Sequence, residues 1–420
     1  MASYNTTFSG GDEDPISESG VWTSGPGAFT AMRIVSGEAQ PSATGLDAAA
    51  FLNSPSIGSN QYVECTAGAS FASGGFIYLI LRTQSSTDGD SYTVSILQDG
   101  TCGFYLATDT GSLTWTQIGA TLALGARSPG DVFKLTVEGP ILSLYLNGVY
   151  QTSRIHHTRT SGQPGIGGYG TSTTVSGATT SATAGDLALT GPIIAGVVEN
   201  LRTGTTDPWT WSHTNGTTAP KGVLVAIMHG TTATDHVLTV TYGGVSMTRV
   251  QRNTDTATEP GAAEWWFLGS SVPTGTQTVS VDLATATTDD LHGVSITLEA
   301  TTNLEVVDVD GLTNTNAANP SVTLQYGGRA CRSFSALYSG LTAITSLAAG
   351  TGCVAISTSE LAGNFTSQAF MQAVGGTSDF AIGVTAVADD VAYAAVAIGE
   401  VIIGGASTSP GWFSNRGGWW

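Results

Sequence analysis

The sequence has few charged residues and very few basic ones. Charged side chains make up 11 % of the 420 residues, and 13 basic residues against 32 acidic ones give a formal net charge of −19. The only lysines are Lys134 and Lys221. Proteins that bind nucleic acid neutralise phosphates with Lys and Arg, so this balance argues against DNA or RNA as a partner. It argues equally against docking on anionic lipid.

Long apolar runs and a targeting signal are also missing. The best apolar run, residues 391–403, is interrupted by Glu400 and is shorter than the ~18 residues that indicate a membrane-spanning helix. We therefore expect no membrane insertion. Residues 1–5 carry neither a basic region nor an apolar stretch, so we expect no signal peptide and synthesis in a cytoplasm.

Cysteine is scarce, with two residues in each half of the chain: Cys65, Cys102, Cys331 and Cys353. Pairing within each half stays open, because the sequence cannot show the geometry that a disulfide needs. Without a secretion signal, small buried hydrophobic residues are the favoured interpretation. In residues 61–65, Val63 and Cys65 would share one strand face, opposite Glu64.

Glycine and short apolar segments are abundant. The chain has 55 glycines and is 41 % hydrophobic, and its apolar residues come in short runs between Gly, Ser, Thr and Asn. A helical protein of this size would need far more Leu, Glu, Lys and Gln. The pattern therefore predicts an all-β fold with two jelly-roll-like β-sandwich domains in tandem and a short aromatic C-terminal tail.

The clearest local structure is a meander between residues 131 and 154. Apolar and polar residues alternate over 133–138 and again over 142–146, as in strands with one buried face. Asn147-Gly148 follows the second strand and predicts a type I′ hairpin turn, with 149–154 as the returning strand. Further short strands are expected over 75–82, 91–98 and 103–107.

Composition divides the chain into three parts: residues 1–188, 189–405 and 406–420. Residues 170–185 hold almost only Gly, Ser, Thr and Ala, which predicts a flexible connection or a solvent-facing edge strand. Strand patterns resume at 209–212, 222–228, 237–242, 279–283 and 294–298, and two strands close the second domain between 378 and 403. No repeat of fixed period is found, and the recurrence of Tyr-Gly-Gly at 242–244 and 326–328 is too short to define one.

Motifs for cofactors and nucleophiles give no positive signal. Residues 165–170 match G-x-G-x-x-G, but no strand–helix context surrounds them, so a glycine-rich loop is expected there. G-x-S-x-G is absent, and the six histidines fit no metal-binding spacing. His213 would share a strand face with Trp211 as a half-buried neighbour. The predicted sets of catalytic, cofactor-binding and metal-binding residues are therefore empty.

One acidic cluster is a candidate for chemistry. Glu305, Asp308 and Asp310 have the spacing E-x-x-D-x-D, with Gly311 following. Glycan cleavage needs two carboxyl groups about 5–10 Å apart, and Asp-x-Asp-Gly is a fragment of a calcium loop. The remaining calcium-ligand positions are absent, so a solvated turn is the favoured interpretation.

Tryptophans supply the other candidates. Trp115, Trp265 and Trp266 are possible platforms for sugar rings, although one of the adjacent pair must face a core because neighbours on a strand point in opposite directions. Aromatic residues also occur in the glycine-rich C-terminal tail, where we expect them to dock on the protein itself or on a partner. These predicted docking residues are Trp412, Phe413, Trp419 and Trp420.

Residues 133–138 (FKLTVE) and 144–149 (LYLNGV), together with Phe8-Ser9-Gly10 and Trp22, resemble concanavalin A-like (laminin-G-like) lectin and glucanase jelly rolls over residues 1–188. The catalytic E-x-D-x-x-E of the glucanase members does not occur here. The resemblance therefore implies a binding or scaffold version of the fold.

Residues 209–214 (WTWSHT), 240–245 (VTYGGV) and 272–276 (VPTGT) resemble β-sandwich modules of phage tail and virion-surface proteins. Together, the two resemblances imply a non-enzymatic structural or adhesion protein of a bacteriophage virion: a tail fibre, a spike or a head decoration protein. Its expected partners are other virion proteins, copies of itself and a host glycan. The alternatives are a bacterial surface carbohydrate-binding protein and a glycan-cleaving enzyme.

Overall fold

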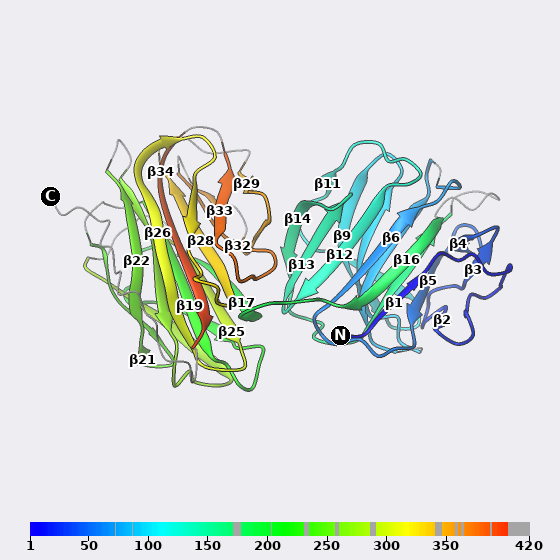
Figure 1. The fold of residues 1–420 in the computed structure, drawn as a ribbon, viewed down its shortest axis with the longest axis horizontal. Coiled ribbons are helices and arrows are strands. Elements are labelled where there is room, and N and C mark those ends of the chain that lie inside the picture. The colour runs from blue at the N-terminus through cyan, green and yellow to red at the C-terminus, as the bar shows by residue number, and fades with distance from the viewer. Residues whose placement is uncertain are drawn as a thin grey trace.

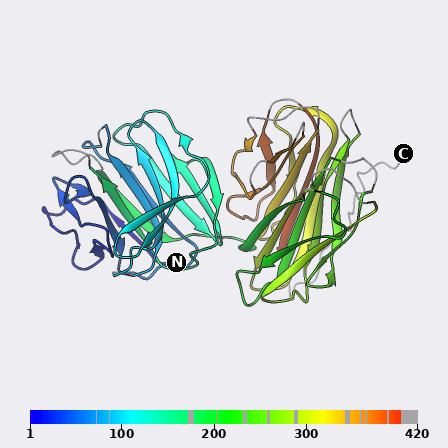
Figure 2. The same cartoon turned by 180° about the vertical axis from the view of Figure 1, so that it is seen from behind.

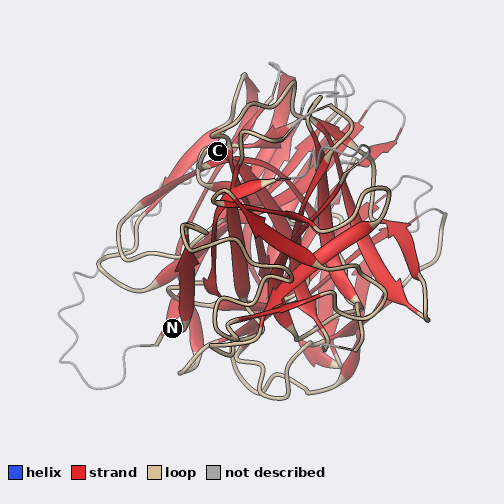
Figure 3. Cartoon of the chain, turned by 90° about the vertical axis from the view of Figure 1, so that its right-hand side faces the viewer, coloured by secondary structure: helices blue, strands red, loops and turns tan. Residues whose placement is uncertain are grey.

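A computed structural model describes residues 1–401 except 72, 86, 171–177, 203, 231–234, 257–259, 286–290, 341–346, 358–359, 363–364 and 387–388. Every regular element in these residues is a strand (Figure 3), which confirms the all-β prediction. The strands form two bodies that lie side by side and are joined between β16 and β17 (Figures 1 and 2). The described residues include no helix that is long and apolar enough to cross a membrane.

The N-terminal sandwich, residues 3–186, contains two sheets. The first has the order β14-β13-β12-β6-β16-β4-β3, with β1 beside β16. Its strands are β1 (Ser3–Thr6), β3 (Met32–Val35), β4 (Glu38–Pro41), β6 (Gln61–Ala67), β12 (Val132–Glu138), β13 (Ile141–Leu146), β14 (Val149–Ile155) and β16 (Thr179–Asp186). The second has the order β10-β9-β8-β7-β15-β5-β2, with β11 beside β9. Its strands are β2 (Trp22–Ser24), β5 (Asp47–Leu52), β7 (Phe76–Thr83), β8 (Ser91–Leu97), β9 (Thr101–Asp109), β10 (Leu113–Gln117), β11 (Leu122–Ala123) and β15 (Gln163–Tyr169).

Alternation along the strands sorts side chains between the core of this sandwich and its outer faces. On β7, Ile77, Leu79 and Leu81 belong to the core between the two sheets, whereas Tyr78 and Ile80 belong to a separate cluster on the outer face. The predicted hairpin is confirmed, because the β13–β14 turn has positive φ at both Asn147 (51°) and Gly148 (78°), as a type I′ turn requires.

Two glycine-rich or small-residue segments differ from the sequence prediction: the first is a strand and not a loop, and the second is an internal strand and not an edge strand. The expected loop at 165–170 is mostly β15, which pairs with both β7 and β5. Residues 179–186 form β16, an internal strand between β6 and β4. Small residues are needed there because neighbouring backbone lies close: a Cβ on Gly167 would lie 2.4 Å from the carbonyl oxygen of Ala48.

The C-terminal double sandwich, residues 193–400, contains four sheets. The sheet orders are β17-β25-β19-β23-β22, β18-β24-β20-β21, β26-β34-β28-β32-β30 with β31 beside β32, and β27-β33-β29. The strands of the first two sheets are β17 (Ile193–Arg202), β18 (Trp209–Thr214), β19 (Gly222–His229), β20 (Val237–Tyr242), β21 (Val245–Ser246), β22 (Thr248–Asp255), β23 (Gly261–Leu268), β24 (Thr276–Leu283) and β25 (Leu291–Glu299). Those of the last two are β26 (Leu304–Ala317), β27 (Ser321–Leu324), β28 (Cys331–Ser339), β29 (Ala348–Ala349), β30 (Cys353–Ala355), β31 (Glu360–Ala362), β32 (Phe365–Gln372), β33 (Phe380–Thr385) and β34 (Asp389–Glu400).

The strand order of residues 193–299 recurs in residues 304–400. In both stretches the first strand lies beside the last and the last beside the third. A smaller sheet is built from the second, the penultimate and a middle strand, to which the first stretch adds β21. The two larger sheets face each other across a shared core that contains Trp265, Phe334 and Ile398. Residues 189–405 were expected to form one pair of sheets, but the described residues in this range form two pairs. The predicted domain limits at 188 and 405 stay predictions.

A buried ion pair joins the two bodies. The carboxylate of Glu138, at the end of β12, accepts hydrogen bonds from both terminal nitrogens of Arg332 on β28 and from the backbone N–H of Ile194. Arg332 is completely buried and also donates to the carbonyl oxygens of Gln372 and Ala373. Beside this pair, Ile141 enters the core of the double sandwich.

Candidate functional site

The outer face of the β7 sheet carries a cluster of aromatic side chains. Tyr78 lies at its centre and is 5 % exposed, whereas Phe76, Tyr105, Trp115 and Tyr169 around it are only partly buried. The Trp115 ring lies 5.7 Å from that of Tyr78 and 6.0 Å from that of Tyr105, centroid to centroid. We call this surface the aromatic face.

The aromatic face is concave. Trp115 is on β10 and Asp47 is on β5, five strand spacings away in the sheet order, which is about 24 Å across a flat sheet. Yet the indole Nε1 of Trp115 donates to Asp47 Oδ2 at 3.2 Å. The sheet must therefore curl, with this face on the inside. Phe29 also packs edge-on against Trp115, at 5.9 Å between ring centroids.

Asp47 fixes the orientation of two of these rings. Its second oxygen, Oδ1, accepts a hydrogen bond of 2.5 Å from the Tyr78 hydroxyl. Burial raises the pKa of Tyr78, and the neighbouring Asp47 carboxylate raises it further, so the phenol stays a hydrogen-bond donor. Trp115 and Tyr78 are thus held in place before any ligand arrives.

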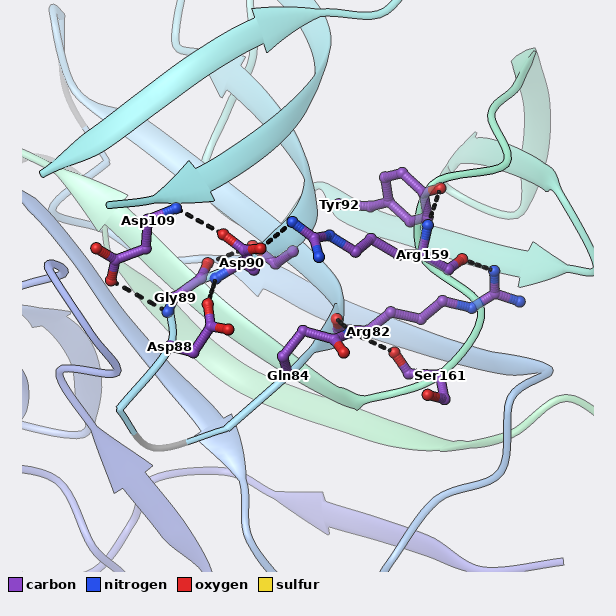
Figure 4. Close-up of polar contacts among 10 residues, drawn as sticks. Arg82, Gln84, Asp88, Gly89, Asp90, Tyr92, Asp109, Arg159 and Ser161 are labelled. Carbon is purple, nitrogen blue, oxygen red and sulfur yellow. Dashed lines mark hydrogen bonds and ion pairs between the residues drawn. The ribbon is translucent and has the colours of Figure 1, made fainter. Parts of the chain in front are cut away.

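At one end of the aromatic face a chain of polar contacts joins three acidic residues to two arginines (Figure 4). Asp109, at the end of β9, accepts hydrogen bonds from the backbone N–H groups of Ala28, Gly89 and Gly111. These donors, Gly111 first, lower its pKa. Its own N–H donates to Asp90, which pairs with Arg159.

Asp109 also shapes a hollow of about 640 Å³ that Gly27, Ala28, Thr87, Asp88 and Gly111 complete. Only glycine fits at position 27, because φ is +55° and a Cβ there would lie 1.9 Å from Asp109 Oδ2. The hollow is therefore bordered by backbone that the Asp109 carboxylate holds in place.

This arrangement suits binding. Partly exposed aromatic rings offer flat apolar surface with polar edges, and carboxylate oxygens accept hydrogen bonds from hydroxyl groups. Both oxygens of Asp47 accept hydrogen bonds, and the lowered pKa of Asp109 keeps it ionised. A glycosidase needs a carboxylic acid whose pKa is raised, whereas the pKa of Asp109 is lowered.

Of the three tryptophans predicted as platforms, Trp115 lies on the aromatic face, but Trp265 and Trp266 cannot be platforms. Trp265 is fully buried in the core between the two larger C-terminal sheets, and Trp266 is 5 % exposed inside the first C-terminal sandwich. The adjacent residues do point in opposite directions, but β23 is covered on both sides.

Glu305, Asp308 and Asp310 lie on β26 without converging on a site. Glu305 pairs with Arg329 at 2.7 Å, while Asp308 accepts the N–H of Gln325 and Asp310 that of Gly311. Asp308 thus binds the turn after β27. No group of three or more His, Cys, Asp or Glu side chains able to hold a metal ion occurs in the described residues.

The other sequence candidates are structural or undescribed. All four cysteines are buried and unpaired, as the favoured interpretation predicted. His213 is fully buried, not half-buried, with its ring nitrogens bonded to Ser295 and Thr297. The predicted docking residues Trp412, Phe413, Trp419 and Trp420 lie outside the described residues.

Sequence reasoning missed most of the aromatic face. Phe76, Tyr78 and Ile80 alternate with Ile77, Leu79 and Leu81, so β7 reads as a continuous apolar run with no polar face. The available signal was the type of residue: the outward positions carry two aromatic rings, whereas the inward ones are aliphatic. Asp47 gives no local signal, because its partners lie 31 and 68 positions away.

Comparisons with known proteins come from solved structures, because no protein-family model and no curated protein matches the chain. The carbohydrate binding module CBM66 from Bacillus subtilis is 17 % identical and covers 40 % of this chain and 92 % of its own, with a TM-score of 0.30. The Bacillus licheniformis β-glucanase is 11 % identical over 44 % of this chain and 99 % of its own, with a TM-score of 0.30. Domains LG4-5 of the mouse laminin α1 chain are 13 % identical over 62 % of this chain and 81 % of their own, with a TM-score of 0.22. The similar structures are thus lectin-like, glucanase and laminin G proteins, at identities that concern the fold alone.

Proposed function

We propose that this chain is a non-catalytic adhesion protein that binds the sugar rings of a glycan on the aromatic face of its N-terminal sandwich. The observation that carries the proposal is the placement of Trp115. Its ring is partly exposed, lies in a concave surface and is held by Asp47, Tyr78 and Phe29. A fixed platform loses little conformational entropy when a ligand binds.

The same residues support a binding role without bond cleavage. Glycoside hydrolysis in most families needs one carboxyl group as acid and a second as base or nucleophile. On the aromatic face Asp47 holds two aromatic side chains, and at its end Asp109 holds three backbone N–H groups. Both carboxylates serve to orient the protein itself.

The test is glycan binding by Trp115→Ala, measured on a glycan array and then by calorimetry with the best ligand. We expect at least a tenfold loss of affinity, because stacking on an aromatic ring is removed. The matched control is Tyr62→Ala, which removes a partly buried ring from the outer face of the other sheet. Equal losses in both variants, or no glycan bound by the unaltered chain, would contradict the proposal.

Catalysis is tested on the glycan that binds. The chain is incubated with that glycan and the products are analysed by mass spectrometry for new reducing ends. We expect none. Cleavage that disappears in Asp47→Asn or Asp109→Asn would establish the enzymatic alternative and overturn the non-catalytic part of the proposal.

We further propose that the protein lies on the surface of a bacteriophage virion, in a tail fibre, a spike or a head decoration, with other virion proteins and copies of itself as partners. Its acidic, charge-poor composition and its tandem sandwiches support this setting. Gold-labelled antibody against the chain should decorate purified particles in electron micrographs. Label on bacterial cells and none on particles would favour the bacterial surface alternative.

A further inference from the structure

A second cavity lies between the two bodies, and the contacts from Asp109 through Asp90 to Arg159 link it to the end of the aromatic face. It measures about 430 Å³, within the range of ligand pockets, which occur preferentially at domain interfaces. Arg82, His156 and Arg159 line it from the N-terminal sandwich, and Ser212, Thr214 and Glu299 line it from the double sandwich. Its base is fixed, because Gly139 approaches Ile194 so closely that a Cβ on the glycine would lie 2.5 Å from the carbonyl oxygen.

Arg82 is the unusual member of this lining. Its side chain is buried, with the residue only 2 % exposed. The guanidinium donates to the carbonyl oxygens of Ser59 and Arg159, but none of the ion pairs among the described residues includes it. Burial lowers its pKa to about 10, so it is still a cation at neutral pH.

A buried cation that faces a cavity without a carboxylate partner favours an anion in that cavity. Each terminal nitrogen of Arg82 uses one of its two protons on a carbonyl oxygen. The second protons can form the paired hydrogen bonds that a planar carboxylate accepts. Arg82 also has positive φ, 56°, a strained conformation for a non-glycine residue that often marks a functional site.

The other walls restrict the charge of the ligand. Arg159 is already paired with Asp90, so Arg82 is the one cation of the lining without a carboxylate. Glu299 adds a negative charge on the opposite wall. A dianionic phosphate, with about −1.5 to −2 charges, would exceed what one guanidinium balances, whereas a single carboxylate matches it.

The uncharged lining suits hydroxyl groups. Ser59, Asn60, Thr160, Ser212 and Thr214 line the cavity, and side chains of these types both donate and accept hydrogen bonds, while Glu299 accepts them. Asn60 Oδ1 already accepts the N–H of Gly139, and the Thr214 hydroxyl bonds to that of Thr276. We propose that this cavity binds a monoanionic sugar of the uronic acid class, with its carboxylate on Arg82 and its hydroxyl groups on the serine, threonine and glutamate side chains.

The test is calorimetry with glucuronate against its neutral methyl ester, glucose and inorganic phosphate. We expect glucuronate to bind the unaltered chain at least tenfold more tightly than each of the other three. Ser212→Trp fills the cavity from the exposed side of β18 and should abolish binding. Arg82→Lys keeps the charge but removes the planar pair of donors, and should weaken binding at least tenfold.

The controls separate this site from the aromatic face and from a general effect of replacing an arginine by lysine. Arg127→Lys alters an arginine whose partner is Asp131, outside the cavity, and should bind as the unaltered chain does. Trp115→Ala should also keep glucuronate binding, so failure of the glycan proposal does not affect this test. No binding of glucuronate, equal binding of the methyl ester, tighter binding of phosphate or an unaffected Ser212→Trp variant would each overturn the proposal.

Discussion

Two tryptophans on outward-facing strand positions show how differently the two bodies use their sheet faces. Trp115 lies on the outer face of an N-terminal sheet and stays partly exposed. Trp265 lies on the face of β23 that points away from its own sandwich, yet it is fully buried and donates to the carbonyl oxygen of Ala394 at 3.1 Å. The difference is the second sandwich, which covers Trp265 and has no counterpart over Trp115.

An aromatic residue on a strand therefore acquires its role from what covers the sheet. In the double sandwich the larger sheets bury both faces, so β19, β23 and β28 are buried along their whole length. In the N-terminal sandwich the outer face of the β7 sheet carries partly exposed aromatic residues, which remain available to a ligand. The three predictions that follow test this contrast.

The largest effect is expected for Trp265→Ala. Loss of a buried tryptophan costs about 3–5 kcal/mol, and this one also leaves the Ala394 carbonyl without its partner, so we expect about 5 kcal/mol. Trp115→Ala should cost about 1 kcal/mol or less, because its ring is already partly exposed on an outer sheet face. Chemical denaturation of the full chain measures both, and equal losses would remove the contrast.

A smaller loss, about 4 kcal/mol, is expected for Arg332→Met, because removal of one partner leaves the buried Glu138 charge uncompensated. The free energy of unfolding again measures it. Arg127→Met is the control, since its pair with Asp131 has partly exposed side chains and a 3.6 Å separation, and such pairs contribute about 0–1 kcal/mol. A double variant, Arg332→Met with Glu138→Gln, should recover part of the loss. If the single variant is as stable as the control, the ion pair does not hold the bodies together.

The third prediction concerns acid stability. Burial lowers the pKa of His292 to about 4, below its value in the unfolded chain, so the unfolded state binds the proton more readily. The native state loses stability as pH falls from about 6.5 to 4, by about 3 kcal/mol. Glu199, 3.9 Å away, is the acidic group facing the ring.

His292→Gln should therefore flatten the pH dependence of unfolding between pH 6.5 and 4, although it also loses the bond to Ser367. His156, partly exposed in the N-terminal sandwich, provides the matched variant His156→Gln, which should change the slope less. An unchanged slope in His292→Gln would show that the pKa of this histidine is the same in the native and the unfolded protein.

Much of the fold follows from local sequence. The strands at 133–138 and 142–146 and the Asn147-Gly148 turn were predictable, because alternation and turn chemistry act over a few residues. Residues 165–169 and 179–186 were mistaken for loop or edge, because Gly and Ala carry little strand signal. Their strand conformation comes from neighbours on both sides.

The pairing of the two C-terminal sandwiches could not be predicted, since strand order depends on contacts far apart in the chain. The recurring Tyr-Gly-Gly was not a usable signal: Tyr242 ends β20, whereas Tyr326 follows β27, so the two occupy different places in the repeated order. Asp47 could not be identified from the sequence for the same reason, because only the curl of the sheet brings Trp115 close to it.

The recurrence of one strand order on both sides of the Trp265 core has a consequence for assembly. The face of the first larger sheet is covered by the next stretch of the same polypeptide, not by a second molecule. The contact is therefore present at any concentration, even in a dilute sample, and dilution cannot separate its halves. Any higher assembly must be built through other surfaces, so its strength can change without exposing this interior.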